Sequence, residues 1–207
     1  MVGVTIPQGR LRQYFATPVV DFEVPQSDRL NDELEAAILA KMGSDKGIQV
    51  SNRGGWHSDR DFRDWSGKAG RQLLSYAVAI ADQHTLGPKQ GAPPEWQTDA
   101  WANVSESGHF NMPHVHGATF WAAVYFVRTG EGTGGELVLH DPRMPGLQMH
   151  APGVRFKGNG EEGEIALAPR PGQMILFPGW LAHSVEPWHG TGTRISVAMN
   201  LRARMSS

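Results

Sequence analysis

Arg194-Ile-Ser-Val-Ala-Met-Asn-Leu201 is the most informative segment for the fold of this chain. Its side chains alternate in character, as in a β-strand, where successive residues point to opposite faces. One face carries only apolar side chains and must meet a core; it consists of Ile195, Val197, Met199 and Leu201. The opposite face begins with Arg194 and Ser196. That face meets water in an ordinary amphipathic strand and the interior in a β-barrel.

A histidine shortly before this strand favours the barrel. His183 ends the stretch Phe177-Pro-Gly-Trp-Leu-Ala-His183. If the two strands lie side by side in a barrel, Arg194 and Ser196 face the lumen. A buried guanidinium without a partner is too unfavourable to persist. A carboxylate held by the fork of Arg194 satisfies it, and Ser196 can donate to the same group.

A second pair of histidines suggests a metal site. Asn111-Met-Pro-His-Val-His-Gly117 places His114 and His116 two residues apart, which is a same-face spacing on a strand. The preceding proline also allows two solvated loop residues. With His183 as a distant third imidazole, a metal site is favoured. The other histidines are interpreted as surface or packing residues: His57, His84, His109, His140, His150 and His189.

Other candidate residues have simpler interpretations. Asp141 precedes a proline and is expected to end a strand in a turn rather than to bind a metal. Asn103 and Asn111 could either hydrogen-bond a ligand or stabilise turns. The nearby aromatic residues are predicted to be core rather than a substrate platform: Phe120, Trp121, Tyr125 and Phe126.

Composition narrows the class of protein. The 207 residues carry a net charge of -2 with a pI of about 6.5, which gives no basis for binding nucleic acid. There is no cysteine, so imidazole and carboxylate are the available metal ligands. Neither a signal peptide nor an apolar run of the roughly 20 residues that span a bilayer is visible, so a cytoplasmic protein is expected.

Helices precede strands along the chain. A strand is expected at residues 12–24, a helix at 27–42, and a second helix at 61–84 whose continuity Gly70 weakens. Short strands follow, at residues 98–104, 118–127, 136–140, 147–150, 164–167, 173–177, 183–186 and 193–201. We therefore predict an α+β fold, a double-stranded β-helix (jelly-roll, cupin-like) barrel with the N-terminal helices packed on its major sheet. Residues 1–207 are expected to form a single domain, with 1–95 supplying the N-terminal strand and helices and 96–207 the barrel.

Two motif templates fit a jelly roll. Gly108-x5-His114-x-His116 matches the opening of the cupin signature, and Gly172-x5-Pro178 followed by His183 resembles its second part. The cupin glutamate is absent, because residues 117–123 contain no acid. The fold prediction survives this mismatch, but a cupin function gains no support.

The second template fits better. The order of the histidine pair, the distant histidine and Arg194-x-Ser196 resembles the Fe(II)- and 2-oxoglutarate-dependent oxygenases. More narrowly, the chain is similar to the bacterial "putative 2OG-Fe(II) oxygenase" family. Further stretches that carry this similarity are Tyr14-Phe-Ala-Thr-Pro-Val19, Ser51-Asn-Arg-Gly-Gly-Trp-His-Ser58, Trp101-Ala-Asn-Val104, Gly134-Gly-Glu-Leu137 and Asp141-Pro-Arg143.

The resemblance implies Fe(II), 2-oxoglutarate and O2, and a hydroxylase-type oxidation of an unknown substrate. It implies His114, His116 and His183 as metal ligands. Arg194 would clamp the distal carboxylate of 2-oxoglutarate with help from Ser196, and Asn103 is a further candidate contact. His116 stands where most of these oxygenases have a carboxylate, so Zn(II) also suits the site. No acid–base residue is required.

Two alternatives stay open at this point. One is a three-histidine enzyme of cupin type that does not use 2-oxoglutarate, either a zinc hydrolase or a dioxygenase. The other is a non-catalytic barrel that binds a small acid. The expected partner is a small-molecule or unknown substrate, without nucleic acid or membrane, and a homodimer is one option for assembly. Residues 130–135 and 153–163 are candidate lids.

Overall fold

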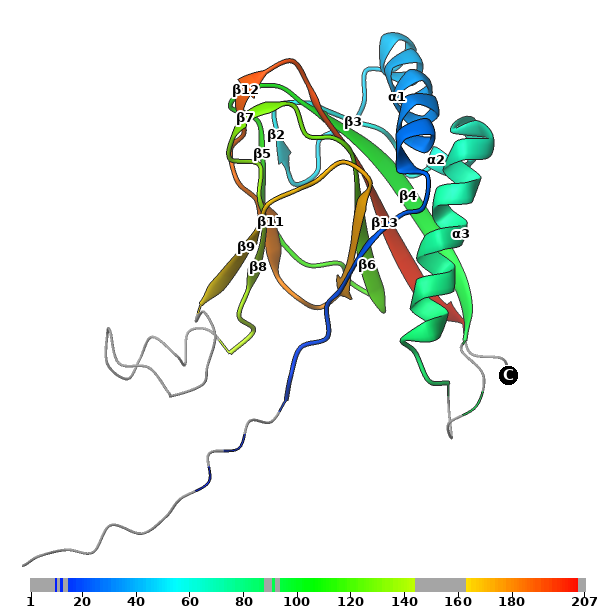
Figure 1. Ribbon diagram of the computed structural model, residues 1–207, viewed down its shortest axis with the longest axis vertical. Coiled ribbons are helices and arrows are strands. Elements are labelled where there is room, and N and C mark those ends of the chain that lie inside the picture. Colours follow the sequence, from blue (N-terminus) through cyan, green and yellow to red (C-terminus); the bar gives the residue numbers. More distant parts are fainter. Residues whose placement is uncertain are drawn as a thin grey trace, which may run out of the picture.

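A computed structural model describes residues 10, 12, 15–87, 91, 94–143 and 163–204 of the chain. It shows two antiparallel sheets facing each other, with helices on the outer side of the larger one (Figure 1). In the described part, no helix is long and apolar enough to cross a membrane. The expected strand at 147–150 and most of the candidate lid at 153–163 lie outside the described residues.

The larger sheet has six strands in the order β1-β10-β6-β13-β4-β3. Its members are β1 (Val20–Glu23), β3 (Trp56–His57), β4 (Glu95–Ser105), β6 (Trp121–Arg128), β10 (Gln173–Pro178) and β13 (Arg194–Arg204). Strands β4 and β13 pair along their whole length, from Arg194 opposite Ser105 to Arg204 opposite Glu95. The final strand is thus central in the sheet, and both of its faces can be buried.

In the described part of the chain, the smaller sheet has five strands in the order β2-β5-β11-β8-β9. They are β2 (Asn52–Arg53), β5 (Phe110–His114), β8 (Leu137–His140), β9 (Glu164–Leu167) and β11 (His183–Val185). A two-stranded ribbon of β7 (Glu131–Thr133) and β12 (His189–Thr191) closes one end of the barrel, and Figure 1 shows it at the top. The candidate lid at 130–135 contains β7.

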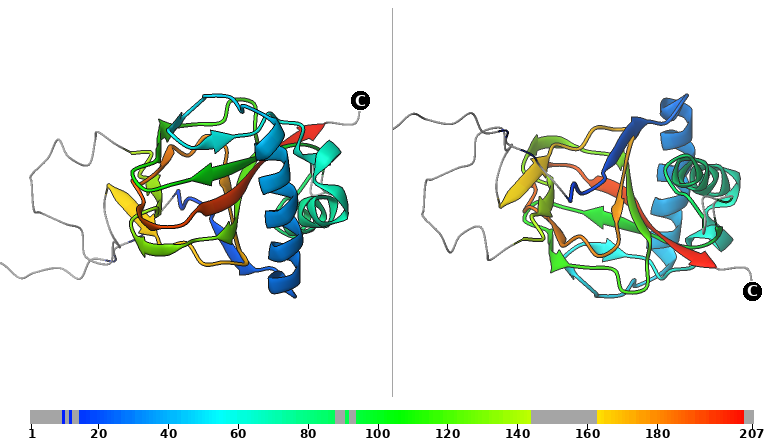
Figure 2. Two further views of the ribbon diagram at one scale, coloured as in Figure 1. Left: turned by 90° about the horizontal axis from the view of Figure 1, so that it is seen from above. Right: turned by 90° about the horizontal axis from the view of Figure 1, so that it is seen from below.

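The described residues form three helices: α1 (Ser27–Ser44), α2 (Phe62–Trp65) and α3 (Gly67–Gln83). Helix α1 buries Leu30, Leu34 and Ile38, whose spacing of four residues forms one stripe. Helix α3 buries several small residues, which allow it to approach the sheet closely. Both helices pack on the outer face of the larger sheet, as the end-on views in Figure 2 show.

The alternation in β13 separates two cores. Ile195, Val197, Met199 and Leu201 pack against the helices in the larger core. A second core lies between the sheets and includes Phe126 and Phe177. Arg194, Ser196 and Asn200 lie on the opposite face of β13 from the first set and are buried too. The barrel interpretation of this strand is therefore correct, and the solvated one is wrong.

Several expected elements differ in extent. Of the strand predicted at 12–24, residues 13–14 lie outside the described part, and the described residues form only β1, because Pro18 and Pro25 flank it and proline cannot donate to a ladder. The helix predicted at 61–84 divides at Gly67, whose φ is +65°, rather than at Gly70. Gly70 instead allows close packing, since a Cβ there would lie 1.7 Å from Ser66 Oγ. The short strands β2, β3, β7 and β12 were not predicted, and β5 was expected only as a strand that carries His114 and His116.

Candidate metal centre

Three imidazoles converge inside the barrel. Their candidate ligand atoms, one each from His114, His116 and His183, all lie within 4.8 Å of one another. His114 ends β5 directly opposite His183, which begins β11. His116 lies beyond the end of β5, so the expectation that both histidines share one strand face is wrong in detail. Its backbone N–H donates to Gly179 O at 2.8 Å, which holds this segment beside the turn that precedes His183.

An irregularity in β5 helps to line the lumen. His114 pairs with His183, and Asn111 pairs with Val185, so three steps along β5 match two along β11. Such a bulge turns residues at odd spacing toward the same side. Asn111 and His114 therefore both line the cavity between the sheets. Pro113, which lacks an N–H, lies within this irregular stretch.

Each imidazole is held through its Nδ1 atom. His114 Nδ1 lies 2.7 Å from Met112 O, and His183 Nδ1 lies 2.9 Å from Leu181 O. His116 Nδ1 lies 2.5 Å from Asn200 Oδ1. In the tautomer that donates from Nδ1 to these oxygens, every Nε2 atom carries a free lone pair. Outer hydrogen bonds of this kind orient histidines that bind metals.

Burial keeps these rings neutral. It lowers the pKa of His183 to about 3 and that of His116 to about 4, and it lowers the pKa of His114 as well. The imidazole of His114 is a further cause, because its positive charge would lower the pKa of His183 and of His116 as well. Neutral imidazoles can each donate a lone pair to a cation at pH 7.

The spacing of the rings suits one shared ion. His116 Nε2 and His183 Nε2 are 3.1 Å apart. Two nitrogens that each lie about 2.1 Å from one cation, at roughly a right angle, would be separated by about 3 Å. Two Nε2 lone pairs that face each other without a cation or a proton between them would repel. The donor set therefore fits a divalent transition metal.

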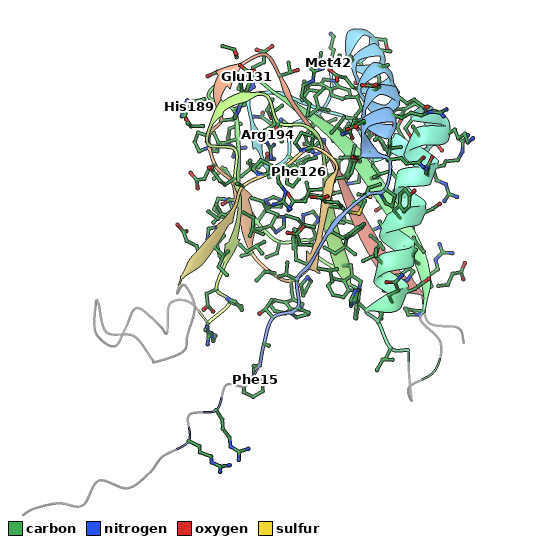
Figure 3. All side chains as sticks on the ribbon, viewed as in Figure 1. Phe15, Met42, Phe126, Glu131, His189 and Arg194 are labelled. Carbon is green, nitrogen blue, oxygen red and sulfur yellow. The ribbon has the colours of Figure 1, made fainter. Side chains whose placement is uncertain are left out.

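Arg194 is the second unusual feature of the lumen. Only 3% of its surface is exposed, and neither Nε nor Nη2 has a hydrogen-bond partner among the described residues. Its guanidinium carbon lies 5.4 Å from the centre of the Phe126 ring, and both residues lie in the interior in Figure 3. Burial lowers the pKa of Arg194 to about 10, against the opposing effect of Glu136, so it stays charged at neutral pH. A buried cation of this kind needs an anionic partner.

One cavity joins the histidines and the arginine. It has a volume of about 60 Å³ and is lined by the three histidines, Arg194, Ser196 and Asn103, among others. Ser196 and Asn103 are paired across β13 and β4, which places both on the lumen side of the larger sheet. The candidate site residues that the sequence suggested thus come together in a single space.

Sequence reasoning missed several residues around the metal centre. Asn200 was assigned to the polar face of its strand, but its contact with His116 was not foreseen. Trp101 stacks on His116 with ring centres 5.7 Å apart, and His57 stacks on Trp101 at 5.6 Å. His57 is therefore a packing residue, as expected. Only the position of Asn200 on the Arg194 face could have signalled its role.

Two other interpretations have clear outcomes. Asp141 follows β8 in a turn and accepts hydrogen bonds from Arg143, and it is not part of the histidine cluster, in agreement with its predicted role. Trp121, Tyr125 and Phe126 are buried as predicted. Phe120 is half exposed, so its assignment to the core is wrong. It comes just before β6, where the chain still runs along the barrel rim.

The antiparallel barrel with its outer helices is the double-stranded β-helix of the jelly-roll class. Residues 99–200 match the family model described as "Putative 2OG-Fe(II) oxygenase". Residues 99–200 form a domain of the 2OG-Fe(II) oxygenase family, as the sequence resemblance implied. The protein is an Fe(II)- and 2-oxoglutarate-dependent oxygenase that uses O2. No curated protein sequence matches the chain.

Solved structures support the fold. A prolyl-4-hydroxylase from Pseudomonas putida is 19% identical with a TM-score of 0.61, covering 91% of this chain and 94% of its own. A prolyl hydroxylase from Trichoplax adhaerens, solved with a hypoxia inducible factor peptide fragment, is 13% identical with a TM-score of 0.60. The match covers 89% of this chain and 83% of that hydroxylase. The α-ketoglutarate-dependent epimerase SnoN from nogalamycin biosynthesis is 12% identical with a TM-score of 0.65. The match covers 90% of this chain and 78% of the epimerase. At these identities the likeness concerns the fold alone.

Proposed function

We propose that His114, His116 and His183 hold the Fe(II) of this oxygenase, and that Arg194 and Ser196 hold the distal carboxylate of 2-oxoglutarate. The observation that carries this proposal is the buried guanidinium of Arg194, which shares a cavity with the imidazoles and whose Nε and Nη2 find no hydrogen-bond partner in the described part of the chain. A carboxylate bound by its fork would supply the missing hydrogen bonds. Asn103, opposite Ser196, is a further contact for the co-substrate.

The chain's own residues bind, orient and exclude water. Fe(II), when bound, supplies the activation of O2 and the oxidative decarboxylation of 2-oxoglutarate to succinate and CO2. The three imidazoles act as neutral ligands, with Nδ1 donating outward and Nε2 facing the metal. Phe126 and Phe177 make the surrounding wall apolar, which strengthens the attraction between Arg194 and a carboxylate. None of these roles requires a general base.

The neutral third ligand distinguishes this centre from the usual two-histidine, one-carboxylate set. Because His116 takes the place of a carboxylate, all three proposed protein ligands are neutral, and none carries a negative charge to the metal. An anionic co-substrate would then compensate more of the metal's charge. We expect the affinity for the metal to rise clearly when 2-oxoglutarate is present, because the anionic co-substrate and the metal cation would partly neutralise each other's charge.

We further propose that the substrate is a small molecule or a peptide. The structural neighbours include prolyl hydroxylases, one of them solved with a peptide, and enzymes of nogalamycin biosynthesis. Self-association into a homodimer is part of the same proposal and can be measured by analytical ultracentrifugation. The single domain of residues 1–207 also remains a proposal, testable by limited proteolysis.

Metal analysis combined with a succinate assay tests the assignment. Protein purified without oxygen should bind one Fe(II) per chain and form succinate from 2-oxoglutarate, even without substrate. His183→Ala should lose the metal, whereas Ile165→Ala on the exposed edge of β9 should keep it. Stoichiometric iron in His183→Ala would contradict the ligand assignment.

A further inference from the structure

A second hollow lies outside the lumen. This groove has a volume of about 830 Å³ and runs between β1, the C-terminal end of α3, and the segments before β6 and after β10. Its apolar walls are Val19, Ile80, Leu86, Phe120, Trp121 and Trp180. Phe120 and Trp180 are 50% and 55% exposed, although large aromatic side chains gain most by burial.

A single buried hydroxyl in the groove lacks a partner. Thr119 lines the groove and is only 9% exposed, yet its Oγ1 has no hydrogen bond among the described residues. Buried polar atoms are bonded in the great majority of cases. The orphan hydroxyl, like the guanidinium of Arg194, therefore points to a ligand atom that completes it. This observation is independent of the shape of the groove.

The charges around the groove disfavour an anionic ligand. No lysine or arginine is present among its described lining residues. Its one carboxylate, Asp21, accepts hydrogen bonds from Gln173 Nε2 at 2.9 and 3.0 Å. A carboxylate, sulfonate or phosphate placed here would lose water, would lie near the carboxylate of Asp21, and would find only His84 and the threonine hydroxyls as possible donors among the polar side chains. The groove therefore suits an uncharged, largely apolar molecule with one hydrogen-bonding group.

Two residues that line the groove, Thr119 and Trp180, are close in sequence to the candidate metal-binding histidines. Thr119 follows His116 by three residues, and Trp180 precedes His183 by three residues. A chain extends at most about 3.6 Å per residue. The Cα of Thr119 therefore lies within roughly 11 Å of the Cα of His116, and the Cα of Trp180 lies within the same distance of the Cα of His183. The two wall segments are also joined, because Gly179 N donates to Phe120 O at 3.0 Å.

We propose that this groove binds the uncharged, apolar body of the substrate, and that the Thr119 hydroxyl hydrogen-bonds its polar group. The substrate assignment rests on the proposed function of the metal centre. A volume of about 830 Å³ lies within the range of roughly 300–1,000 Å³ that small-molecule sites have. Binding of the non-reacting body here would hold the reacting carbon near the metal, which is how remote contacts contribute to catalysis.

A matched pair of fluorescent probes tests the site in metal-free protein. N-phenyl-1-naphthylamine is neutral and has one N–H, and 8-anilino-1-naphthalenesulfonate is the same skeleton with an anionic group. The neutral probe should bind at least about tenfold more tightly, which corresponds to about 1.4 kcal/mol. Equal affinities, or no binding of the neutral probe, would overturn the proposal.

Three variants locate the probe. Val19→Trp fills the groove and should weaken binding of the neutral probe at least about tenfold. Ile165→Trp, at an equally exposed apolar position on β9, is the matched control and should bind as the parent protein does. Thr119→Val keeps the shape of the side chain and should weaken binding about fivefold, as expected for one hydrogen bond. Undiminished binding by Val19→Trp would overturn the groove as the site.

A spectroscopic experiment separates the groove from the metal centre. The neutral probe should shift the d–d absorption of the Co(II)-loaded protein, and the shift should be absent in Val19→Trp. An unchanged Co(II) spectrum despite probe binding would overturn the substrate assignment of the groove. Failure of the protein to bind Co(II) would instead contradict the proposed metal centre. The probe titrations of metal-free protein would still test whether the groove binds the neutral probe.

Discussion

Asn200 Oδ1 accepts a hydrogen bond from His116 Nδ1 at 2.5 Å, and this contact joins the last strand of the barrel to the candidate metal ligand that lies outside any strand. His114 and His183 are oriented by backbone carbonyls, which no substitution of a side chain removes. His116 alone depends on a side chain for its orientation. The geometry of the centre is therefore most sensitive to residue 200.

Asn200→Leu should weaken metal binding roughly 10- to 100-fold, because the imidazole of His116 loses the acceptor that orients it. Asn200→Asp keeps an oxygen in the same place and should retain most of the affinity. Titration of metal-free protein with Co(II), followed by absorption, measures both values. Equal weakening in the two variants would mean that the packing of Asn200, and not its oxygen, matters.

The sequence was sufficient to predict what depends on alternation and spacing. The apolar set beginning with Ile195 and the polar set beginning with Arg194 predicted the orientation of β13, since a strand with one apolar face must bury it. The convergence of the histidines followed from strand spacing only in part, because His116 lies beyond β5. Its position depends on long-range bonds to Gly179 and Asn200, which local sequence does not encode.

Other features were hidden for the same physical reason. Strands β2 and β3 have two residues each and exist because β5 and β4 offer edges to pair with. Such short pairings carry no periodic signal of their own. The exposure of Phe120 also depends on a neighbour, because the chain turns at the barrel rim beside Gly179.

Arg194→Met should raise the concentration of 2-oxoglutarate required at least about 30-fold, since truncating one partner of a buried charged pair costs about 2–5 kcal/mol. Metal binding should persist, because the described contacts of His114, His116 and His183 do not include Arg194. Without co-substrate, the variant should melt at a higher temperature than the parent, because it removes a buried charge that has no hydrogen-bond partner at Nε or Nη2 among the described residues. Calorimetry with 2-oxoglutarate and thermal unfolding provide the readouts. Unchanged co-substrate affinity would assign Arg194 a structural role.

Acid should destabilise the metal-free protein between about pH 5 and pH 6.5. The folded-state pKa values of His183 and His116 are about 3 and about 4, below the unfolded value of 6.5. In this window the unfolded chain binds protons that the folded chain does not, so stability falls as the pH falls. Each histidine contributes up to about 1.4 kcal/mol per pH unit. Urea unfolding at several pH values measures the slope, and His183→Asn should reduce it. An identical slope in that variant would contradict the lowered pKa of His183.

Gly135→Ala should weaken 2-oxoglutarate binding in addition to destabilising the fold. Gly135 has a φ of +74°, and a Cβ there would lie 3.2 Å from Cδ and Nε of Arg194 and 3.2 Å from Cδ1 of Trp188. Trp188 and Arg194 are both buried, but only Arg194 borders the cavity between the sheets, so the guanidinium has room to yield and the indole has not.

Gly108→Ala is the matched control, because its φ is +87° and nothing lies within 4 Å of the added Cβ. Both variants should lose about 1–2 kcal/mol of stability from the left-handed conformation. Only Gly135→Ala should also bind 2-oxoglutarate less tightly, as measured by calorimetry in the presence of Co(II). If Gly108→Ala weakened co-substrate binding equally, the effect would come from general destabilisation rather than from displacement of Arg194. If neither variant weakened co-substrate binding, the added Cβ at residue 135 would not displace the guanidinium of Arg194 from its binding position. That result would contradict the prediction.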